Sequence, residues 1–560
     1  MSVESGDHRQ GLVAKSLLLL NLSVAFLLAA ALLIAPVAVD QIHMDDTVLL
    51  ANVAWRGVNG YAPVIDYPHF YGGFAESFVT ASFMVFGVSY KAIDYAFVTL
   101  FLLTASLVWL LCWTRLRNVE TSLLTALGAA IILSLDPLEA FQHFRPGHSF
   151  VYNHVGIVLM LALTVFACRT VESRRAELAS ALAAGGAIHT LVLLKTTFGL
   201  FSLSLVLACL VQKRWLAAGL VMVGGAVTML VLDPTMERAL GSLGLLLTSE
   251  AAAQAGGFEG RLLMASLMLK TQALPIAIVL ILTAVLWRRT RRKSLPLIAS
   301  LLVCGAGYSA AMLTTGGNPE HKLLPFLVVA ALLLCKALTE AAPADSSVRP
   351  WLISAVPIIL AYSLILPSVA TFAIAISQSF EQRDASLVEH GPLARYVVFD
   401  PAESHSAVAR SERLTAATAN TLQHVRSGKV SDRDEYVMLA DGMKLLRQVD
   451  NVSAFGIISN GRMFDFTAPL QSKVVASYPV WPTLASPELM VDKPLEADVD
   501  MVMVLDEIPE LGLVSGALRA RMGGDFRPCR RSAFWTLFVR RSVTNASCAS
   551  SSLTHRSSLD

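Results

Sequence analysis

Two adjacent carboxylates, Asp45 and Asp46, follow a long apolar segment near the start of the chain. A carboxylate at a membrane exit can act as a general base and take the proton from an attacking hydroxyl group. Burial beside a second carboxylate would raise the pKa of such a base towards a useful value. The alternative is that the two carboxylates are simply solvated at the end of the span and have no function. From the residues that surround the pair, we predict Asp45 as the catalytic base and Asp46 as its helper.

Cations at the ends of other apolar segments could hold a phosphate group. Lys195 interrupts "LVLLKTTFGLF", where an ammonium is costly unless it faces a polar cavity; the alternative is a lysine that snorkels to the interface. His321 and Lys322 lie in the Gly-rich "GGNPEHKLLP", which is suited to an anionic headgroup or is an ordinary exposed turn. With Arg145 of "EAFQHFRPGHSFVYNH", these residues are the predicted donor-phosphate site.

A third group of side chains is suited to binding a sugar. The predicted substrate contacts are Tyr61, Asp66, Tyr67, His69, Glu139, His148 and His154. Aromatic rings can stack on sugar faces, although anchoring at the membrane interface explains them equally well. Asp136 and Glu139 could also assist with the acceptor or hold a divalent cation, Mg²⁺ or Mn²⁺. No residue is assigned as a metal ligand, because no Cys or His spacing matches a zinc site.

The elements that must position these residues are membrane-spanning helices. The chain has 560 residues, 55% of them hydrophobic and 15% charged, whereas a soluble protein has about 25% charged residues. We predict a mainly α, polytopic membrane protein with about eleven transmembrane helices. The predicted spans are 17–39, 92–113, 122–135, 151–168, 178–194, 197–211, 216–232, 274–287, 295–313, 323–338 and 351–376.

Short basic clusters orient these spans. With a cytoplasmic N-terminus, all of them fall on the cytoplasmic side, including "RRTRRK" at 288–293, in agreement with the positive-inside rule. This topology requires that the 74–88 segment does not cross, so we predict a juxtamembrane helix there on the outer face. The predicted location is a bacterial inner membrane, with the C-terminal part in the periplasm. Nothing in the basic residues indicates binding of nucleic acid.

The domain prediction follows from this topology. Residues 1–378 form the transmembrane domain, whose outer-face loop, 40–91, carries juxtamembrane helices. Residues 379–541 form a small exported α/β domain, because strand patterns such as "VDMVMVL" alternate with helical ones such as "DEYVMLADGMKLLRQV". Residues 542–560 are a polar, disordered tail. Whether the two exported cysteines, Cys529 and Cys548, form a disulfide is left open.

The order of features in about the first 115 residues resembles the start of the C-type (GT-C) membrane glycosyltransferases. The counterparts are the acidic pair, "GYAPVIDYPHFYGG", and "FGVS" before the second span. Three positions depart from the family pattern. The pair is Asp-Asp where the family often has Asp-Glu, Asp94 stands where an arginine is common, and "EHK" at 320–322 replaces an Arg-Tyr near a late span.

This resemblance implies an inverting glycosyltransferase. It would move a sugar from a polyprenyl-phosphate carrier to a glycan, lipid or protein acceptor on the outer face of the bilayer. The alternative is a transporter or flippase of a lipid-linked or small anionic substrate, which would bind near the midplane. The polar residues instead gather at the outer ends of the spans. The sugar, the acceptor, the number of carrier phosphates and the oligomeric state are not determined by the sequence.

Overall fold

The computed structural model describes most of the chain. The residues outside the described part are 1–3, 43, 66–71, 137, 139–144, 149–150, 172, 249–256, 314–321, 342–349, 383–394, 399–409, 428–429, 447, 449–453, 460–472, 480–499, 506–523 and 544–560. The predicted tail therefore lies almost wholly outside the described residues.

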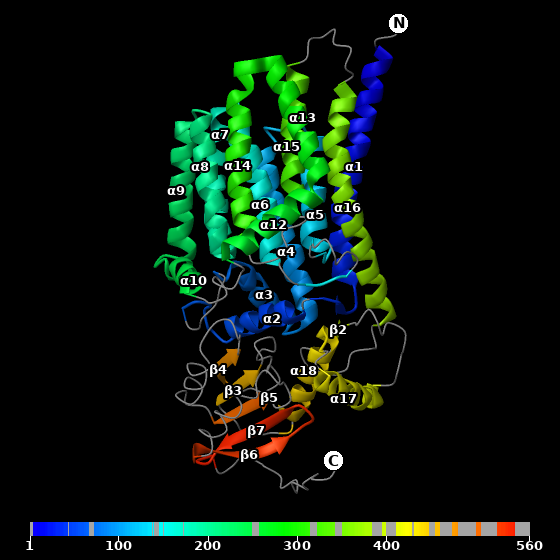
Figure 1. The fold of residues 1–560 in the computed structure, drawn as a ribbon, viewed down its shortest axis with the longest axis vertical. Coiled ribbons are helices and arrows are strands. Elements are labelled where there is room, and N and C mark those ends of the chain that lie inside the picture. Colours follow the sequence, from blue (N-terminus) through cyan, green and yellow to red (C-terminus); the bar gives the residue numbers. More distant parts are fainter. Residues whose placement is uncertain are drawn as a thin grey trace.

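A bundle of helices forms the larger part of the molecule (Figure 1). Each predicted span corresponds to one helix: α1 (Glu4–Ile34), α4 (Tyr90–Cys112), α5 (Asn118–Leu133), α6 (Val151–Cys168), α7 (Arg174–Leu194), α8 (Gly199–Val211), α9 (Trp215–Leu232), α13 (Ala273–Thr290), α14 (Leu295–Leu313), α15 (Leu324–Glu340) and α16 (Pro350–Glu381). Among the described residues, seven stretches are long and apolar enough to cross a membrane, and one of them, Ala273–Leu313, contains both α13 and α14. The prediction of a mainly α, polytopic protein is confirmed.

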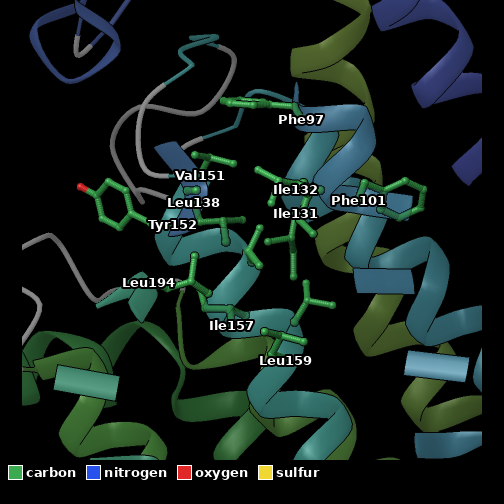
Figure 2. Close-up of a cluster of buried hydrophobic side chains, with 14 of the residues drawn as sticks. Phe97, Phe101, Ile131, Ile132, Leu138, Val151, Tyr152, Ile157, Leu159 and Leu194 are labelled. Carbon is green, nitrogen blue, oxygen red and sulfur yellow. The ribbon is translucent and has the colours of Figure 1, made fainter. Parts of the chain in front are cut away.

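Helix α6 is the centre of the bundle. All 18 of its residues are buried, as expected for a helix that is apolar on every side. It packs against α4, α5, α7, α8, α14 and α15. Figure 2 shows side chains of α6 in a cluster with Phe97 and Phe101 of α4 and Ile131 and Ile132 of α5. Dispersion and apolar burial in this cluster hold the ends of these helices at fixed positions.

Two short helices lie across one end of the bundle, between it and the C-terminal domain (Figure 1). They are α2 (Met44–Val58) and α3 (Phe74–Phe86), which pack on each other, and α3 also packs on α4. A 13-residue helix is about 20 Å long, well short of a ~30 Å hydrocarbon core. Gly73 and Gly87 flank α3 with φ of 83° each, a conformation that favours glycine.

Further short elements connect the bundle helices. They are the 3-10 helices η1 (Thr196–Phe198) and η2 (Arg291–Ser294) and the helices α10 (Glu237–Thr248) and α12 (Gly257–Thr271).

The C-terminal domain contains a five-stranded mixed sheet in the order β4-β3-β5-β7-β6. Its strands are β3 (Ala454–Ser459), β4 (Lys473–Pro479), β5 (Met501–Leu505), β6 (Phe526–Arg531) and β7 (Trp535–Arg540), accompanied by the helices α17 (Arg410–Arg426) and α18 (Asp432–Leu446). Strand β3 is parallel to β4 and β5, whereas β7 is antiparallel to β5 and β6. The Trp535 indole donates to the Met438 carbonyl at 2.8 Å, so α18 is fixed to the sheet. The predicted small α/β domain is confirmed.

A two-stranded parallel ladder connects the two parts of the chain. It pairs β1 (Ala38–Asp40), directly after α1, with β2 (Tyr396–Val398) of the C-terminal part. Helix α16 continues to Glu381, three residues beyond the predicted domain boundary. Cys529 is disulfide-bonded, whereas Cys548 lies outside the described residues. The other five cysteines are free and buried, as expected for residues in or at the ends of apolar spans.

Candidate active site

The acidic pair occupies the first turn of α2, which begins at Met44. Carboxylates are favourable there because the helix N-terminus carries a partial positive charge. The side chain of Asp46 is half-buried, whereas for Asp45 the structure describes the backbone and not the side chain. The structure therefore places Asp46 directly, and the predicted role of Asp45 stays a prediction.

Lys195 is buried within electrostatic range of both Asp46 and a second buried lysine, Lys322. Lys195 follows the last residue of α7, and Lys322 precedes α15. The ammonium-bearing side chains are 8% and 0% exposed, which argues against a lysine that snorkels to water. The pKa of Lys195 is lowered to about 7, mainly by burial and then by the like charge of Lys322, while the carboxylate of Asp46 opposes both effects. We call Asp46, Lys195 and Lys322 the lysine site.

The backbone around Lys195 fixes its position. The chain leaves the α7 helix at this residue with φ of −160°, while its amide still donates to Leu191 O at 2.9 Å. Gly72, just before α3, lies against the Leu193 backbone so closely that a Cβ atom would come within 2.7 Å of the carbonyl oxygen. The lysine nitrogen is 5.5 Å from the ring centroid of Tyr152, whose hydroxyl points away from the apolar cluster in Figure 2.

Lys322 is held from the other side of the bundle. The hydroxyl of Tyr308 in α14 donates a short hydrogen bond to the Lys322 carbonyl oxygen, and the Tyr308 ring is fully buried. Tyr308 in turn packs against Phe326 of α15, with ring centroids 5.2 Å apart. The lysine site thus depends on α7, α14 and α15 together with α2.

A second polar group lies deeper, and we call it the buried ion cluster: Asp40, Lys91, Asp94 and His148. The His148 ring donates from Nδ1 to Asp40 and from Nε2 to Asp94, both at 2.6 Å. Lys91 Nζ donates to the other Asp94 oxygen at 2.6 Å and to the Leu32 carbonyl at 2.6 Å. All four side chains are at most 3% exposed.

The charges in the buried ion cluster balance if His148 is protonated. Burial alone lowers the pKa of His148, but the carboxylates of Asp40 and Asp94 raise it to about 10. Two carboxylates then face one ammonium and one imidazolium, which is the condition for burying charges at acceptable cost. The prediction that His148 contacts substrate stays a prediction; in this structure both ring nitrogens contact carboxylates and the side chain has no exposed surface.

The C-terminal domain contributes to this cluster. The Tyr396 hydroxyl donates to Asp40 Oδ2 at 2.6 Å, and its ring stacks on Tyr90 of α4 with centroids 3.9 Å apart. Burial, followed by the charge of Asp40, raises the pKa of Tyr396 well above its usual value, so the hydroxyl stays protonated and donates. Tyr436 of α18 donates to the Tyr396 carbonyl at 2.7 Å.

Close backbone contacts bring the buried ion cluster next to the acidic pair. Pro146 O accepts a hydrogen bond from Gln41 N at 2.7 Å, and a Cβ atom on Gly147 would come within 2.6 Å of Ile42 O. The cluster therefore fixes the segment that connects β1 to α2, only a few residues before Asp46.

The structure describes three other predicted site residues and leaves five undescribed. Tyr61 is half-buried in the turn after α2, Arg145 is exposed, and His154 is buried in the first turn of α6. Five predicted residues are among those that the structure does not describe: Asp66, Tyr67, His69, Glu139 and His321.

The sequence analysis missed Asp40 and Lys91. Both stand at the edge of apolar segments, and Lys91 and Asp94 have the i,i+3 spacing of a helical ion pair. That spacing was a usable signal for the pair. The link from Asp94 to His148 spans 54 residues, and that from Asp40 to His148 spans 108, so no local pattern contains them.

A divalent cation stays a prediction. In the described part of the chain, no three His, Cys, Asp or Glu residues are grouped to hold a metal ion. Asp136, one of the two suggested carboxylates, already accepts hydrogen bonds from Leu138 N at 3.0 Å and Ser368 Oγ at 3.2 Å. Its partner in that suggestion, Glu139, is not described.

The fold and this site define a polytopic membrane protein with a cationic and acidic site at one end of its bundle, beneath two short helices and an α/β domain. No protein-family model and no curated protein sequence matches the chain.

Solved structures that are similar to it include two of ArnT from Cupriavidus metallidurans. The structure bound to undecaprenyl phosphate has a TM-score of 0.44 and 10% sequence identity, and the alignment covers 93% of this chain and 97% of the ArnT chain. The apo structure has a TM-score of 0.45 and 12% identity, and covers 94% and 98%. Both TM-scores lie below 0.5, so the case for a function rests on the side chains of this chain.

Proposed function

We propose that the protein is a membrane glycosyltransferase. Its donor is a sugar linked to a polyprenyl phosphate, and its acceptor is a hydroxyl of a glycan, lipid or protein on the outer face of the membrane. The observation that supports this proposal is the lysine site, where the buried Lys195 lies within electrostatic range of both the buried Lys322 and Asp46 of the acidic pair. Two buried like charges are costly unless an anion joins them.

The two lysines have the chemistry that a departing carrier phosphate needs. When the bond between the anomeric carbon and the phosphate oxygen breaks, the electron pair stays on the carrier and its negative charge grows. Preorganised ammonium groups in a water-poor site stabilise that charge more in the transition state than in the bound donor. An anion between Lys195 and Lys322 would also raise the lowered pKa of Lys195, so the donor itself favours the charged form.

The acidic pair supplies the other half of the reaction. A carboxylate of Asp45 or Asp46 takes the proton of the acceptor hydroxyl while the acceptor oxygen bonds to the anomeric carbon. Because a single displacement enters opposite to the leaving phosphate, the configuration at that carbon inverts. The buried ion cluster fixes the segment that precedes the pair, so the base can be held at a defined position relative to the lysines.

The proposed location is a bacterial inner membrane, with the N-terminus in the cytoplasm. The basic turn between α13 and α14 lies at the same end of the bundle as the N-terminus, opposite α2, α3 and the C-terminal domain (Figure 1). This arrangement agrees with the positive-inside rule when the lysine site faces the periplasm.

The test is a comparison of lipid-linked sugars and surface glycans in cells that carry single variants. Asp45→Asn and Asp46→Asn separate the two acids, and Lys195→Met and Lys322→Met remove the phosphate contacts. Loss of a general base typically costs on the order of 10²–10⁴ in rate, so at least one Asn variant should accumulate donor and lose glycan. Glu237→Gln and Lys270→Met, at exposed positions in α10 and α12, are matched controls that should retain activity.

Two results would overturn the proposal. Full glycan transfer by both Asn variants would remove the acidic pair from the chemistry. Intact glycans together with a lost transport phenotype in the lysine variants would instead assign the lysine site to a transporter or flippase.

A further inference from the structure

A cluster of positively charged side chains lies at the end of the bundle opposite the lysine site. We call Arg288, Arg289, Arg291, Arg292 and Lys293 the basic turn; they occupy the last residues of α13 and the 3-10 helix η2. All five side chains are exposed. Within the part of the chain that the structure describes, none of the five belongs to an ion pair. The proposed glycosyl transfer makes no use of them.

A cavity of about 520 Å³ opens beside the basic turn. It lies among α6, α8, α13, α14 and α15, with apolar walls that include Leu286 and Leu297. Its polar lining residues include Arg169, Gln212, Thr290, Lys293, Ser294 and Glu340. The cavity is therefore apolar on one side and carries hydrogen-bonding groups next to the basic turn.

The charges that line the cavity leave it positive. The carboxylate of Glu340 is held by Arg169, with contacts of 2.8 Å from Nη1 and 2.5 Å from Nη2, so these two charges cancel. Lys336, outside the lining, lies at 3.7 Å from the same carboxylate and at 3.8 Å from that of Glu120, so it adds no unpaired charge. Lys293 adds a further positive charge at the rim, and the four arginines of the basic turn lie close by in the chain.

The side-chain amide of Gln212, which lines the cavity, is a buried hydrogen-bond donor without an acceptor in the described structure. The Nε2 atom of Gln212 is inaccessible to solvent and makes no hydrogen bond in the described structure. Buried amide donors are nearly always satisfied, because leaving one unmade costs the full desolvation of that group. An oxygen-rich anion in the cavity would accept from Gln212 and be attracted by Lys293 at the same time.

The surroundings select the kind of anion. Outward-facing residues of α13, among them Leu280, Ile281 and Trp287, are 44–62% exposed, as expected for a lipid-facing surface. A ligand that combines a negative phosphate with acyl chains can place its headgroup in the cavity and its chains along α13. Basic pockets between transmembrane helices on the cytoplasmic side are suited to such headgroups.

We propose that the cavity beside the basic turn binds the phosphate headgroup of an anionic phospholipid from the cytoplasmic leaflet. This site is separate from the lysine site; its leaflet rests on the orientation proposed above, and its binding of lipid does not depend on the glycosyl-transfer reaction. The basic turn then does more than set the topology: it recruits and retains a lipid that seals α13, α14 and α15 at this end of the bundle.

The experiment measures lipid retention by the purified full-length protein. Native mass spectrometry counts phosphatidylglycerol and phosphatidylcholine molecules that stay bound after exchange into detergent. Two variants test the site: the triple variant Arg291→Gln, Arg292→Gln, Lys293→Gln keeps Arg288 and Arg289 for topology, and Gln212→Leu removes the buried donor. The matched control is Arg174→Gln, Arg175→Gln, an exposed basic pair that begins α7 at the same end of the bundle.

The wild type should retain phosphatidylglycerol in preference to phosphatidylcholine. The triple variant should weaken that retention by about 10- to 100-fold, given about fivefold for each surface charge near an anionic bilayer. Gln212→Leu should weaken it severalfold, and the control pair should leave it unchanged. Equal loss in the control and in the triple variant, or no preference for the anionic lipid, would overturn the proposal. Displacement of the lipid by millimolar inorganic phosphate would also overturn it, in favour of a soluble anion.

Discussion

The Tyr396 hydroxyl offers a sharp test of how the C-terminal domain is joined to the membrane bundle. Tyr396→Phe removes one oxygen atom and leaves the ring stacked on Tyr90, where the centroids are 3.9 Å apart. The Oδ1 atom of Asp40 keeps its two donors from His148, the backbone amide at 2.8 Å and the ring Nδ1 at 2.6 Å. The Oδ2 atom loses the Tyr396 donor at 2.6 Å. The perturbation is therefore confined to one charge-assisted hydrogen bond.

The size of the effect follows from the burial and the charge of the acceptor. Asp40 and Tyr396 are both 0% exposed, so water cannot replace the lost donor. A hydrogen bond to a charged group contributes roughly 1.5–3 kcal/mol. We expect the free energy of local opening at the β1–β2 ladder to fall by about 2 kcal/mol. At about 1.4 kcal/mol per tenfold change, the ladder amides should exchange roughly 30-fold faster.

Hydrogen exchange with mass spectrometry, on detergent-solubilised protein, measures this change at residues 38–40 and 396–398. Local exchange is preferable to a melting temperature, because a protein with two structural parts need not unfold in one step. Tyr362→Phe is the control, since its hydroxyl donates to the neutral Asn21 side chain at 2.9 Å, away from the ladder. Unchanged exchange at the ladder in Tyr396→Phe would refute the energetic role assigned to this hydrogen bond.

Three further predictions concern charge and close packing. The pKa of His148 is raised from 6.5 to about 10. The protonated ring therefore contributes its full stabilisation below pH 6.5, and this contribution is lost as the pH rises through 10. A thermal-unfolding profile from about pH 6 to about pH 10.5 that shows no such decline would contradict this. Glu177→Gln leaves its two buried partners, Arg115 and Arg214, without their shared carboxylate. The free energy of unfolding should fall by about 3 kcal/mol in denaturation experiments. A change under about 1 kcal/mol would argue against a buried ion pair. Gly72→Ala puts a Cβ atom 2.7 Å from the Leu193 carbonyl oxygen and should reduce glycan transfer by displacing Lys195. Gly199→Ala, where the nearest atom is at 3.7 Å, should retain transfer, and equal activity of the two variants would exclude the packing argument.

The membrane helices could be predicted from the sequence because hydrophobic length is a local property. All eleven predicted spans are helices, and the apolar segment 74–88 contains a helix of only 13 residues. In the C-terminal part, the alternating pattern of "VDMVMVL" corresponds to β5, and the helical pattern of "DEYVMLADGMKLLRQV" corresponds to α18. The pairing of β1 with β2 could not be predicted, since these strands lie more than 350 residues apart and each has only three residues.

For the site, the sequence identified the charged residues whose position next to apolar segments is energetically unfavourable without a polar partner. Lys195 and Lys322 stand where an ammonium must find a polar partner, and the acidic pair stands at the exit of the first span. The convergence of Lys195 with Lys322 and Asp46 was decided by the packing of α2, α7, α14 and α15. The burial of His148 between two carboxylates was likewise decided by tertiary packing, because Asp40 and Asp94 come from distant segments of the chain. Hydrophobicity acts along the chain and can be summed residue by residue, whereas the energy of a buried charge depends on neighbours that only the folded chain brings within 3 Å.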